Sequence, residues 1–249
     1  MIKRLARAAR SPRRALRNQL DKAELRLLLM THRLPALRLD EVVERDVPID
    51  EPILDDICMP PFIGEGDHDD YSALLKIASL IQPRIIVELG TAHGNTVANL
   101  CRALPNCRVF TVDAPAELQS GRDVTFSLSP EQIGRVYRKH GYADRVTQIL
   151  ANTLTLDLAA PLNGELVDLA IVDACHDTEY VVNDFLKVEP FVRRGGTVLL
   201  HDTHPSMNGH LLGSYRACMR LRRQGFDVRH VEGTWWAIWN NGVGHAAAA

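Results

Sequence analysis

The chain has 249 residues, of which 46% are hydrophobic and 24% are charged. This composition excludes a disordered, collagen-like or disulfide-scaffold protein, and the length allows one large α/β domain or a smaller domain with an appendage. The formal net charge of -2 hides a strong asymmetry. Residues 1–38 hold 11 lysines and arginines against two acidic residues, whereas residues 39–249 hold 18 against 29. A basic arm is therefore joined to an acidic body.

The five cysteines are odd in number and form no C-x-x-C pair, which argues against a disulfide framework and against a thiolate zinc site. A reducing, cytoplasmic setting is the simplest expectation. No stretch approaches the roughly 20 apolar residues that span a bilayer. The sequence therefore predicts a protein that is soluble or bound peripherally to a membrane.

Residues 1–45 predict a basic amphipathic helical extension, broken near Pro12. Apolar residues recur every three or four positions on one of its faces: Leu16, Leu20, Ala23 and Leu27. This pattern is compatible with a solvated extension, with docking on the domain or on a second copy, and with attraction of residues 1–38 to an anionic membrane surface. Nucleic acid is a less favoured partner, because the acidic body would repel phosphate.

Residues 46–69 form an acidic connector rich in proline and glycine. In the domain that follows, residues 70–245, short β-branched or leucine-rich runs alternate with helical segments. The expected strands are 84–89, 108–112, 146–150, 166–172 and 197–200. The expected helices are 95–103, 130–140, 178–191 and 211–224. This alternation predicts a parallel sheet with helices on both faces.

The last two expected strands follow a different pattern. Residues 226–231 and 234–239 are separated only by Glu232 and Gly233, which leaves no room for a crossover helix. These two segments must therefore form an antiparallel hairpin. The predicted fold is α/β and Rossmann-like, with a reversed last strand.

The sequence V-E-L-G-T-A-H-G-N-T of residues 87–96 joins an apolar strand through a glycine loop to a helix. Such a loop lies at the carboxyl end of its strand, where open parallel sheets bind ligands. Gly90 and Gly94, which flank Thr91, let the backbone approach a ligand closely. The spacing lacks the third glycine of a dinucleotide fingerprint, and the acidic Glu88 suits a sulfonium or ammonium group better than a pyrophosphate.

Two polar residues follow the next two expected strands. Asp113 can accept hydrogen bonds from both hydroxyls of a ribose, as acidic residues do at this position. Asn152 either faces an adenine amino group or caps a helix. Both residues are candidates for binding a nucleoside.

Asp173 and Asp202 end neighbouring strands, so their side chains should converge beside the glycine loop. Two carboxylates placed there suit a hard divalent cation such as Mg²⁺. His176 lies three residues beyond Asp173 and is a candidate general base. Two alternatives are open: Asp173 caps the following helix while His201 and Asp202 bond to loop backbone, or the histidines at 176, 201 and 204 bind zinc.

Together these residues resemble the class I S-adenosylmethionine-dependent methyltransferases, over about residues 70–240. The E-L-G-x-x-x-G loop is similar to that of the catechol-type O-methyltransferases. The resemblance implies a seven-stranded sheet with a reversed final strand. It also implies a cofactor site lined by Glu88, Gly90, Thr91, Gly94, Asp113, Asn152 and Asp173.

The resemblance extends to a metal site. In metal-dependent members of the catechol and macrocin types, carboxylates matching Asp173 and Asp202 hold the metal, and a histidine matching His176 resembles the catalytic base of the macrocin type. This chain departs from both patterns: Thr203 replaces an asparagine ligand of the first, and His201 replaces an acidic residue of the second. Either His201 completes a metal site with Asp173 and Asp202, or the site binds no metal.

The acceptor pocket is less defined. Four aromatic residues either line it or belong to the core: Tyr71, Tyr180, Trp235 and Trp236. Residues 60–70 are a candidate lid, and Asp69 or Asp70 is a candidate N-cap for the first helix of the domain.

The resulting hypothesis is an S-adenosylmethionine-dependent O-methyltransferase that acts on a hydroxyl of a small molecule or glycoside. Mg²⁺ or another divalent cation would assist it, with His176 as general base. Two alternatives are an Fe(II)-dependent hydroxylase or other oxidoreductase on the same fold, and a non-catalytic cofactor-binding protein. The acceptor and the oligomeric state, including a homo-oligomer, are left open.

Overall fold

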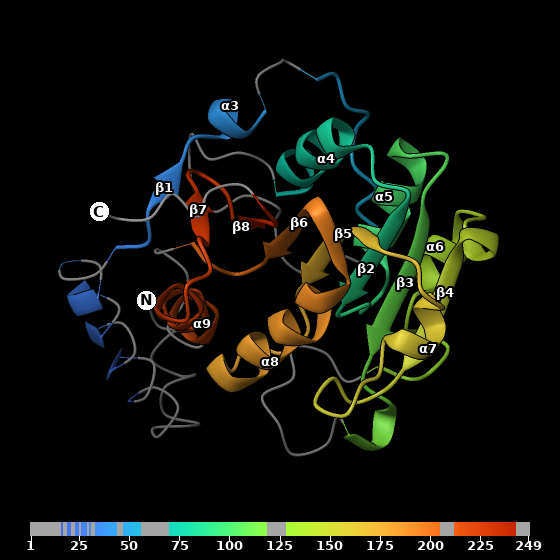
Figure 1. The fold of residues 1–249 in the computed structure, drawn as a ribbon. Coiled ribbons are helices and arrows are strands. Elements are labelled where there is room, and N and C mark those ends of the chain that lie inside the picture. Colours follow the sequence, from blue (N-terminus) through green and yellow to red (C-terminus); the bar gives the residue numbers. More distant parts are fainter. Residues whose placement is uncertain are drawn as a thin grey trace, which may run out of the picture.

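A twisted β-sheet runs through the molecule in the computed structural model of the chain (Figure 1). The structure describes residues 33–43, 47–55, 70–118, 128–204 and 212–242, together with Leu16 and short pieces up to residue 30. In these parts the sheet has eight strands in the order β1-β7-β8-β6-β5-β2-β3-β4. The strands are β1 Ala36–Leu37, β2 Ile85–Leu89, β3 Arg108–Asp113, β4 Val146–Leu150, β5 Val167–Val172, β6 Val192–Leu200, β7 Arg229–Val231 and β8 Ala237–Asn240.

Helices cover both faces of this sheet, as the alternating pattern predicts. The α-helices are α3 Leu39–Val42, α4 Asp70–Ile81, α5 Asn95–Ala103, α6 Arg135–Lys139, α7 Ala159–Leu162, α8 Thr178–Val188 and α9 Leu212–Arg223. Short 3₁₀ turns are η1 Ala116–Leu118, η2 Ala143–Arg145 and η3 Glu189–Phe191. In the described part of the chain, no helix has both the length and the apolar character needed to cross a bilayer.

The five strands β2 to β6 run parallel, and β8 runs antiparallel to both of its neighbours, β6 and β7. The predicted hairpin and the reversed last strand are therefore confirmed. Because parallel strands end at one edge of a sheet, the loops after β2, β3, β5 and β6 gather on the same side of the molecule. This arrangement positions the candidate site.

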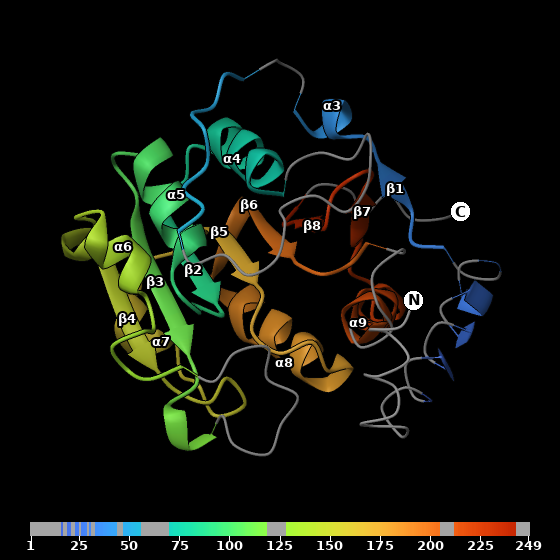
Figure 2. The ribbon, with the colours of Figure 1, turned by 180° about the vertical axis from the view of Figure 1, so that it is seen from behind.

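Alternate residues of the central strands pack into two hydrophobic layers. Val87 faces the layer that contains Phe185 of α8 and Leu221 of α9. Ile86 faces the opposite layer, with Leu74 of α4 and residues of α5. Figures 1 and 2 show these two pairs of helices on opposite faces of the sheet. Burial on both faces explains why the strand sequences are continuously apolar rather than alternating.

The eighth strand, β1, corrects the prediction of seven strands. It comes from the segment expected to be a helical extension, and it pairs in parallel with β7 through Ala36 opposite His230 and Leu37 opposite Val231. Beyond it, α3 buries Leu39 in the layer of α4 and α5. Part of the expected extension thus belongs to the folded domain.

The helix expected over residues 130–140 is shorter than predicted. It begins only at Arg135, because Gly134 has a φ of +70°, outside the region that a helix allows. The connector is described only over residues 47–55 of its length, so the candidate lid before Asp70 lies outside the described residues.

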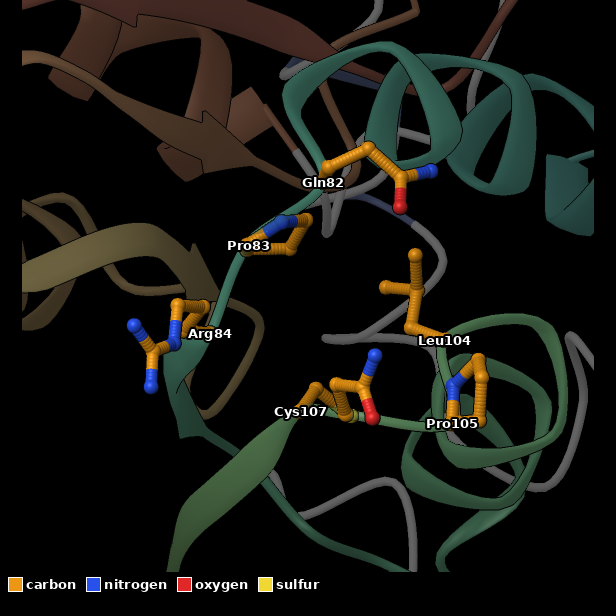
Figure 3. Close-up of a pocket in the computed structure, with 7 residues that line it drawn as sticks. Gln82, Pro83, Arg84, Leu104, Pro105 and Cys107 are labelled. Atoms are coloured by element: carbon orange, nitrogen blue, oxygen red, sulfur yellow. The ribbon is translucent and has the colours of Figure 1, made fainter.

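A pocket of about 450 Å³ lies where β2 and β3 begin (Figure 3). It is lined by Gln82, Pro83, Arg84, Leu104, Pro105, Asn106 and Cys107. In Figure 3 the side chain of Arg84 points away from Leu104 and Pro105. This pocket is at the opposite edge of the sheet from the strand ends that carry the candidate site.

Asp184 on α8 provides a test of the fold. Its carboxyl is buried and accepts a hydrogen bond from the Asn183 amide at 3.0 Å, while its other oxygen, Oδ2, has no hydrogen-bond partner. Burial raises the pKa of Asp184 to about 6. The folded protein therefore holds this proton more tightly than the unfolded chain, so the contribution of Asp184 to stability falls as the pH rises from about 4 to 6.

The variant Asp184→Asn cannot ionise at this position. We expect the free energy of unfolding of the variant minus that of the wild type to increase by roughly 3 kcal/mol when the pH is raised from 4 to 7. Urea unfolding of both proteins at several pH values measures this difference. A difference that does not change with pH contradicts the assignment.

Candidate functional site

The glycine loop after β2 is held close to the end of β5. Gly90 has a φ of +111°, and a Cβ at this position would overlap the carbonyl of Asp173. Its amide donates to the carbonyl of Val112 at 2.8 Å, and the amide of Asp173 donates to Leu89 at 2.8 Å. Only glycine combines this φ with this close approach. The loop therefore lies directly beside the first residue of the second predicted constellation.

Asp113 ties the end of β3 to the same loop. Its Oδ2 accepts the backbone N–H of Ala92, and its Oδ1 accepts that of Ala114, both at 2.7 Å. Burial nevertheless raises the pKa of this carboxyl above its ordinary value. Each oxygen retains a further lone pair, so the carboxylate can still accept ribose hydroxyls at the edge of the sheet.

Glu88 lies inside the sheet, 1% exposed, and not in the loop itself. It accepts a hydrogen bond from the Thr111 hydroxyl, which in turn accepts from Thr91 at 2.6 Å. Gln148 donates to Thr91 at 2.9 Å and accepts from the Tyr137 hydroxyl at 3.1 Å. When Glu88 is ionised its carboxylate can only accept, and the hydroxyls of Thr111 and Thr91 then donate toward it. Burial raises the pKa of Glu88 well above its ordinary value.

The side chain of Asn152 forms a hydrogen bond within its own loop. Its side-chain oxygen accepts the N–H of Leu154 at 3.1 Å, which forms a turn after β4 and not the cap of a helix. Its predicted contact with adenine stays a prediction.

The second constellation is a buried cluster of three carboxylates and two imidazoles. His201 lies at its centre, with Nδ1 3.0 Å from Oδ1 of Asp173 and 3.5 Å from Oδ1 of Asp202. On its other side, Nε2 lies 3.0 Å from Oδ2 of Asp70, the first residue of α4. His176 Nε2 lies 2.6 Å from Oδ2 of Asp202. Asp173, His201 and Asp202 each offer one ligand atom within 4.8 Å of the others.

The charges in this cluster control one another. Burial opposes a charged ring at His201, but the carboxylates of Asp173, Asp70 and Asp202 outweigh it and raise the pKa of His201 well above its ordinary value. In the same way, Asp202 raises the pKa of His176 despite burial. Burial would raise the pKa of Asp202, but the two imidazolium rings lower it. Burial raises the pKa of Asp70 above its ordinary value. When all five groups are ionised, three carboxylates exceed two imidazolium rings, and in this state the cluster has a net negative charge that attracts a further cation.

Backbone and aromatic groups fix this cluster in place. Asp202 has a φ of +58°, a left-handed conformation that turns its side chain at the end of β6. The ring of His201 lies 4.4 Å from Trp236 and 5.4 Å from Trp235, measured between centroids. Trp236 is buried in the core and donates its indole N–H to the backbone carbonyl of Asp70 at 3.2 Å. Trp235 therefore remains an aromatic candidate beside the site, and so does Tyr71, whose hydroxyl has a pKa raised by burial and by the carboxylates of Asp70 and Asp173.

Several alternative roles are now corrected. The carboxylate of Asp173 faces His201, and the residue before α8 is Asp177, so Asp173 does not cap that helix. Asp70 contacts His201 rather than serving as an N-cap. The ring of His204 lies 5.8 Å from His230, and the metal-type cluster found in the described part of the chain does not include His204.

The sequence does not predict three residues of the site. Asp70 contacts His201, and Gln148 bonds to Thr91 of the glycine loop and to Tyr137. The sequence indicates Asp70 only as a helix cap, because 131 positions separate it from His201. Gln148 gives only a weak signal in the sequence, since it and Thr147 are both polar residues within the short strand β4.

Comparison with known proteins finds a family profile that matches the central part of the chain. Residues 87–203 match the family profile described as "Methyltransferase domain", and this range contains the glycine loop, Asp113, Asp173 and Asp202. This match covers 117 of the 249 residues, slightly less than half of the chain, and it agrees with the resemblance to S-adenosylmethionine-dependent methyltransferases inferred from the sequence.

Solved structures share the fold of the methyltransferase domain. An O-methyltransferase from Bacillus cereus in complex with SAH is 17% identical, with a TM-score of 0.51 over 90% of this chain and 98% of that chain. Cofactor-bound Rv0187 from MTB is 23% identical, with a TM-score of 0.51 over 69% of this chain and 79% of that one. SAH-bound PaMTH1 from Podospora anserina is 17% identical, with a TM-score of 0.51 over 69% and 76%.

A curated relative is much longer. The uncharacterized protein y4gI of Sinorhizobium fredii is 25% identical over 187 residues, which is 72% of this chain but 20% of the relative. The chain thus spans about a fifth of that protein.

Substitution of Gly90 tests whether the close approach to Asp173 holds the cofactor loop. We expect Gly90→Ala to weaken binding of S-adenosylhomocysteine at least tenfold and to lower stability by about 1–3 kcal/mol, because the added methyl group cannot fit against the β5 backbone. Calorimetric titration and urea unfolding measure the two effects.

The matched control is Gly141→Ala. Gly141 also has a positive φ, +78°, but no atom lies within 4 Å of its added Cβ. It carries the conformational strain without the overlap. Equal effects of the two substitutions on binding would show that the close approach is unimportant.

Proposed function

We propose that this chain is an S-adenosylmethionine-dependent O-methyltransferase that acts on a hydroxyl group of a small molecule or glycoside. The observation that carries the proposal is the buried His176–Asp202 pair, placed at the same sheet edge as the glycine loop. A base and a donor-binding loop side by side are what methyl transfer to a weakly acidic hydroxyl requires.

The loop and the strand ends would bind the donor. Gly90, Thr91 and Gly94 would let its amino-acid and sulfonium part approach the backbone, and Asp113 would accept the ribose hydroxyls. Asn152 would face the adenine. The net negative charge of the carboxylate cluster beside the loop supports binding of a sulfonium cation, because opposite charges attract strongly where water is excluded.

His176 would act as the general base. Its Nε2 is engaged by Asp202, which fixes the ring and stabilises the imidazolium form, so Nδ1 is the nitrogen available to an acceptor hydroxyl. The neutral form of His176 takes the hydroxyl proton, the oxygen forms a bond to the methyl carbon, and the bond from carbon to sulfur breaks. S-adenosylhomocysteine leaves with the electron pair on sulfur. The proton returns to solvent from His176 after the product has left.

A divalent cation fits the residues present. Asp173, His201 and Asp202 offer two carboxylate oxygens and one imidazole nitrogen within 4.8 Å of one another, a donor set that suits Mg²⁺ less well than Mn²⁺ or Fe²⁺. Asp70 would accept the Nε2–H of His201 and so direct Nδ1 toward the two carboxylates, as outer carboxylates do for metal-bound histidines. When bound, such a cation would lower the pKa of the acceptor hydroxyl.

Replacement of His176 tests the base. We expect His176→Ala to lower kcat about 10²–10⁴-fold, because the acceptor loses its general base, and to leave the Kd of S-adenosylhomocysteine within a few-fold of wild type. Transfer of labelled methyl groups to a panel of hydroxyl compounds measures the first quantity, and calorimetry measures the second.

The matched control is His140→Ala, since His140 pairs with Asp55 and is not part of the acid–imidazole cluster. Tight binding of NADH without binding of S-adenosylhomocysteine would overturn the methyltransferase proposal in favour of an oxidoreductase. Binding of S-adenosylhomocysteine without any methyl transfer would favour a non-catalytic cofactor-binding protein.

Metal binding is tested separately from turnover. We expect Mn²⁺ titrated into the protein and followed by electron paramagnetic resonance to bind at one site, and Asp202→Asn to weaken it at least tenfold because a charged ligand is lost. Asp55→Asn, which removes a carboxylate outside the cluster, should change nothing. Full activity in excess EDTA would contradict metal assistance while leaving the proposed base intact.

A further inference from the structure

An apolar stripe is exposed on the N-terminal arm. The described residues between 16 and 30 are helical, and four large apolar side chains among them are mostly exposed: Leu16 63%, Leu20 61%, Leu27 61% and Met30 85%. In a continuous α-helix, separations of four, seven and three positions place side chains on one narrow face. Burying such a face would release the water that covers it, so the stripe is suited to docking on another surface.

The arm is oriented by contacts on its inner side. Glu24 forms a two-pronged ion pair with Arg216 of α9, with Oε1 2.8 Å from Nε. Leu28 packs against the hydrophobic layer of α8 and α9. Figures 1 and 2 show the described pieces of the arm beside α9, at the edge of the molecule. These contacts explain why the stripe faces away from the domain.

The charge of the arm indicates which kind of surface the apolar stripe can bind. The 11 lysines and arginines of residues 1–38 accompany the stripe, whereas the remainder of the chain is acidic. A second copy of the chain would bring two such basic arms together, and like charges would oppose the pairing. Anionic lipid headgroups would attract each basic residue and also accept the apolar stripe between their acyl chains.

We propose that the stripe of Leu16, Leu20, Leu27 and Met30, together with the basic residues of the arm, docks this chain on the surface of an anionic phospholipid bilayer. The acidic body would be repelled by the same surface, so the arm is the side that meets the lipid. This docking does not depend on the proposed methyl transfer, and its test uses binding alone.

The full-length chain is sedimented with vesicles made of equal parts phosphatidylglycerol and phosphatidylcholine, and with vesicles of phosphatidylcholine alone. We expect binding to the anionic vesicles at least tenfold stronger, and a loss of most of this binding at high salt, since salt screens exposed charges. The double variant Leu20→Gln, Leu27→Gln should bind the anionic vesicles about tenfold more weakly, because it removes apolar area from the stripe.

The matched control is Leu80→Gln, Leu166→Gln, which changes two leucines of the body that are 49% and 55% exposed. It should bind like wild type, and circular dichroism establishes that both double variants are folded. Equal binding to the two kinds of vesicle, or unchanged binding of the stripe variant, overturns the proposal. If light scattering shows that the wild type is a dimer and the stripe variant is a monomer, the stripe binds a second copy of the chain, and this result would also overturn the proposal.

Discussion

The hydrogen bond from the amide of Asp173 to the carbonyl of Leu89 joins the two halves of the candidate site. It continues the pairing of β2 and β5 by one step past the last strand residues, and so it brings the glycine loop against the first carboxylate of the cluster. Gly90 is the residue that permits this approach. The glycine loop and the acid–imidazole cluster are therefore joined at one edge of the sheet.

This edge of the sheet holds several ionisable side chains in a largely buried place, where the charged form loses its hydration. Carboxylates at Asp70, Asp173 and Asp202 are all largely buried, and each would lose its hydration without compensation. The two imidazoles offset this cost by donating hydrogen bonds and by carrying positive charge, as their raised pKa values indicate. Such a cluster stabilises the fold little, because desolvation consumes most of the attraction.

The sequence was informative wherever a local pattern determined the structure. Alternating apolar runs and helices located the central strands, and the two-residue connection before Thr234 required the antiparallel hairpin. Strand ends located Asp113, Asp173 and Asp202, because the carboxyl ends of parallel strands must meet. What no local pattern could indicate were partnerships across the chain, such as Asp70 with His201, or Gln148 with Thr91. The strand β1 was missed for a different reason: two residues are too few to show a period.

The pairing of β1 with β7 also changes where the domain begins. Without β1, the edge of β7 would expose unpaired amide and carbonyl groups, a surface on which strands of other molecules can add. The amides of His230 and Glu232 both donate to carbonyls of this segment, those of Pro35 and Leu37, at 2.9 and 2.8 Å. A truncation that removes the whole basic arm through residue 38 would therefore create an aggregation-prone edge. The sheet therefore includes Ala36 and Leu37, which composition alone assigns to the arm.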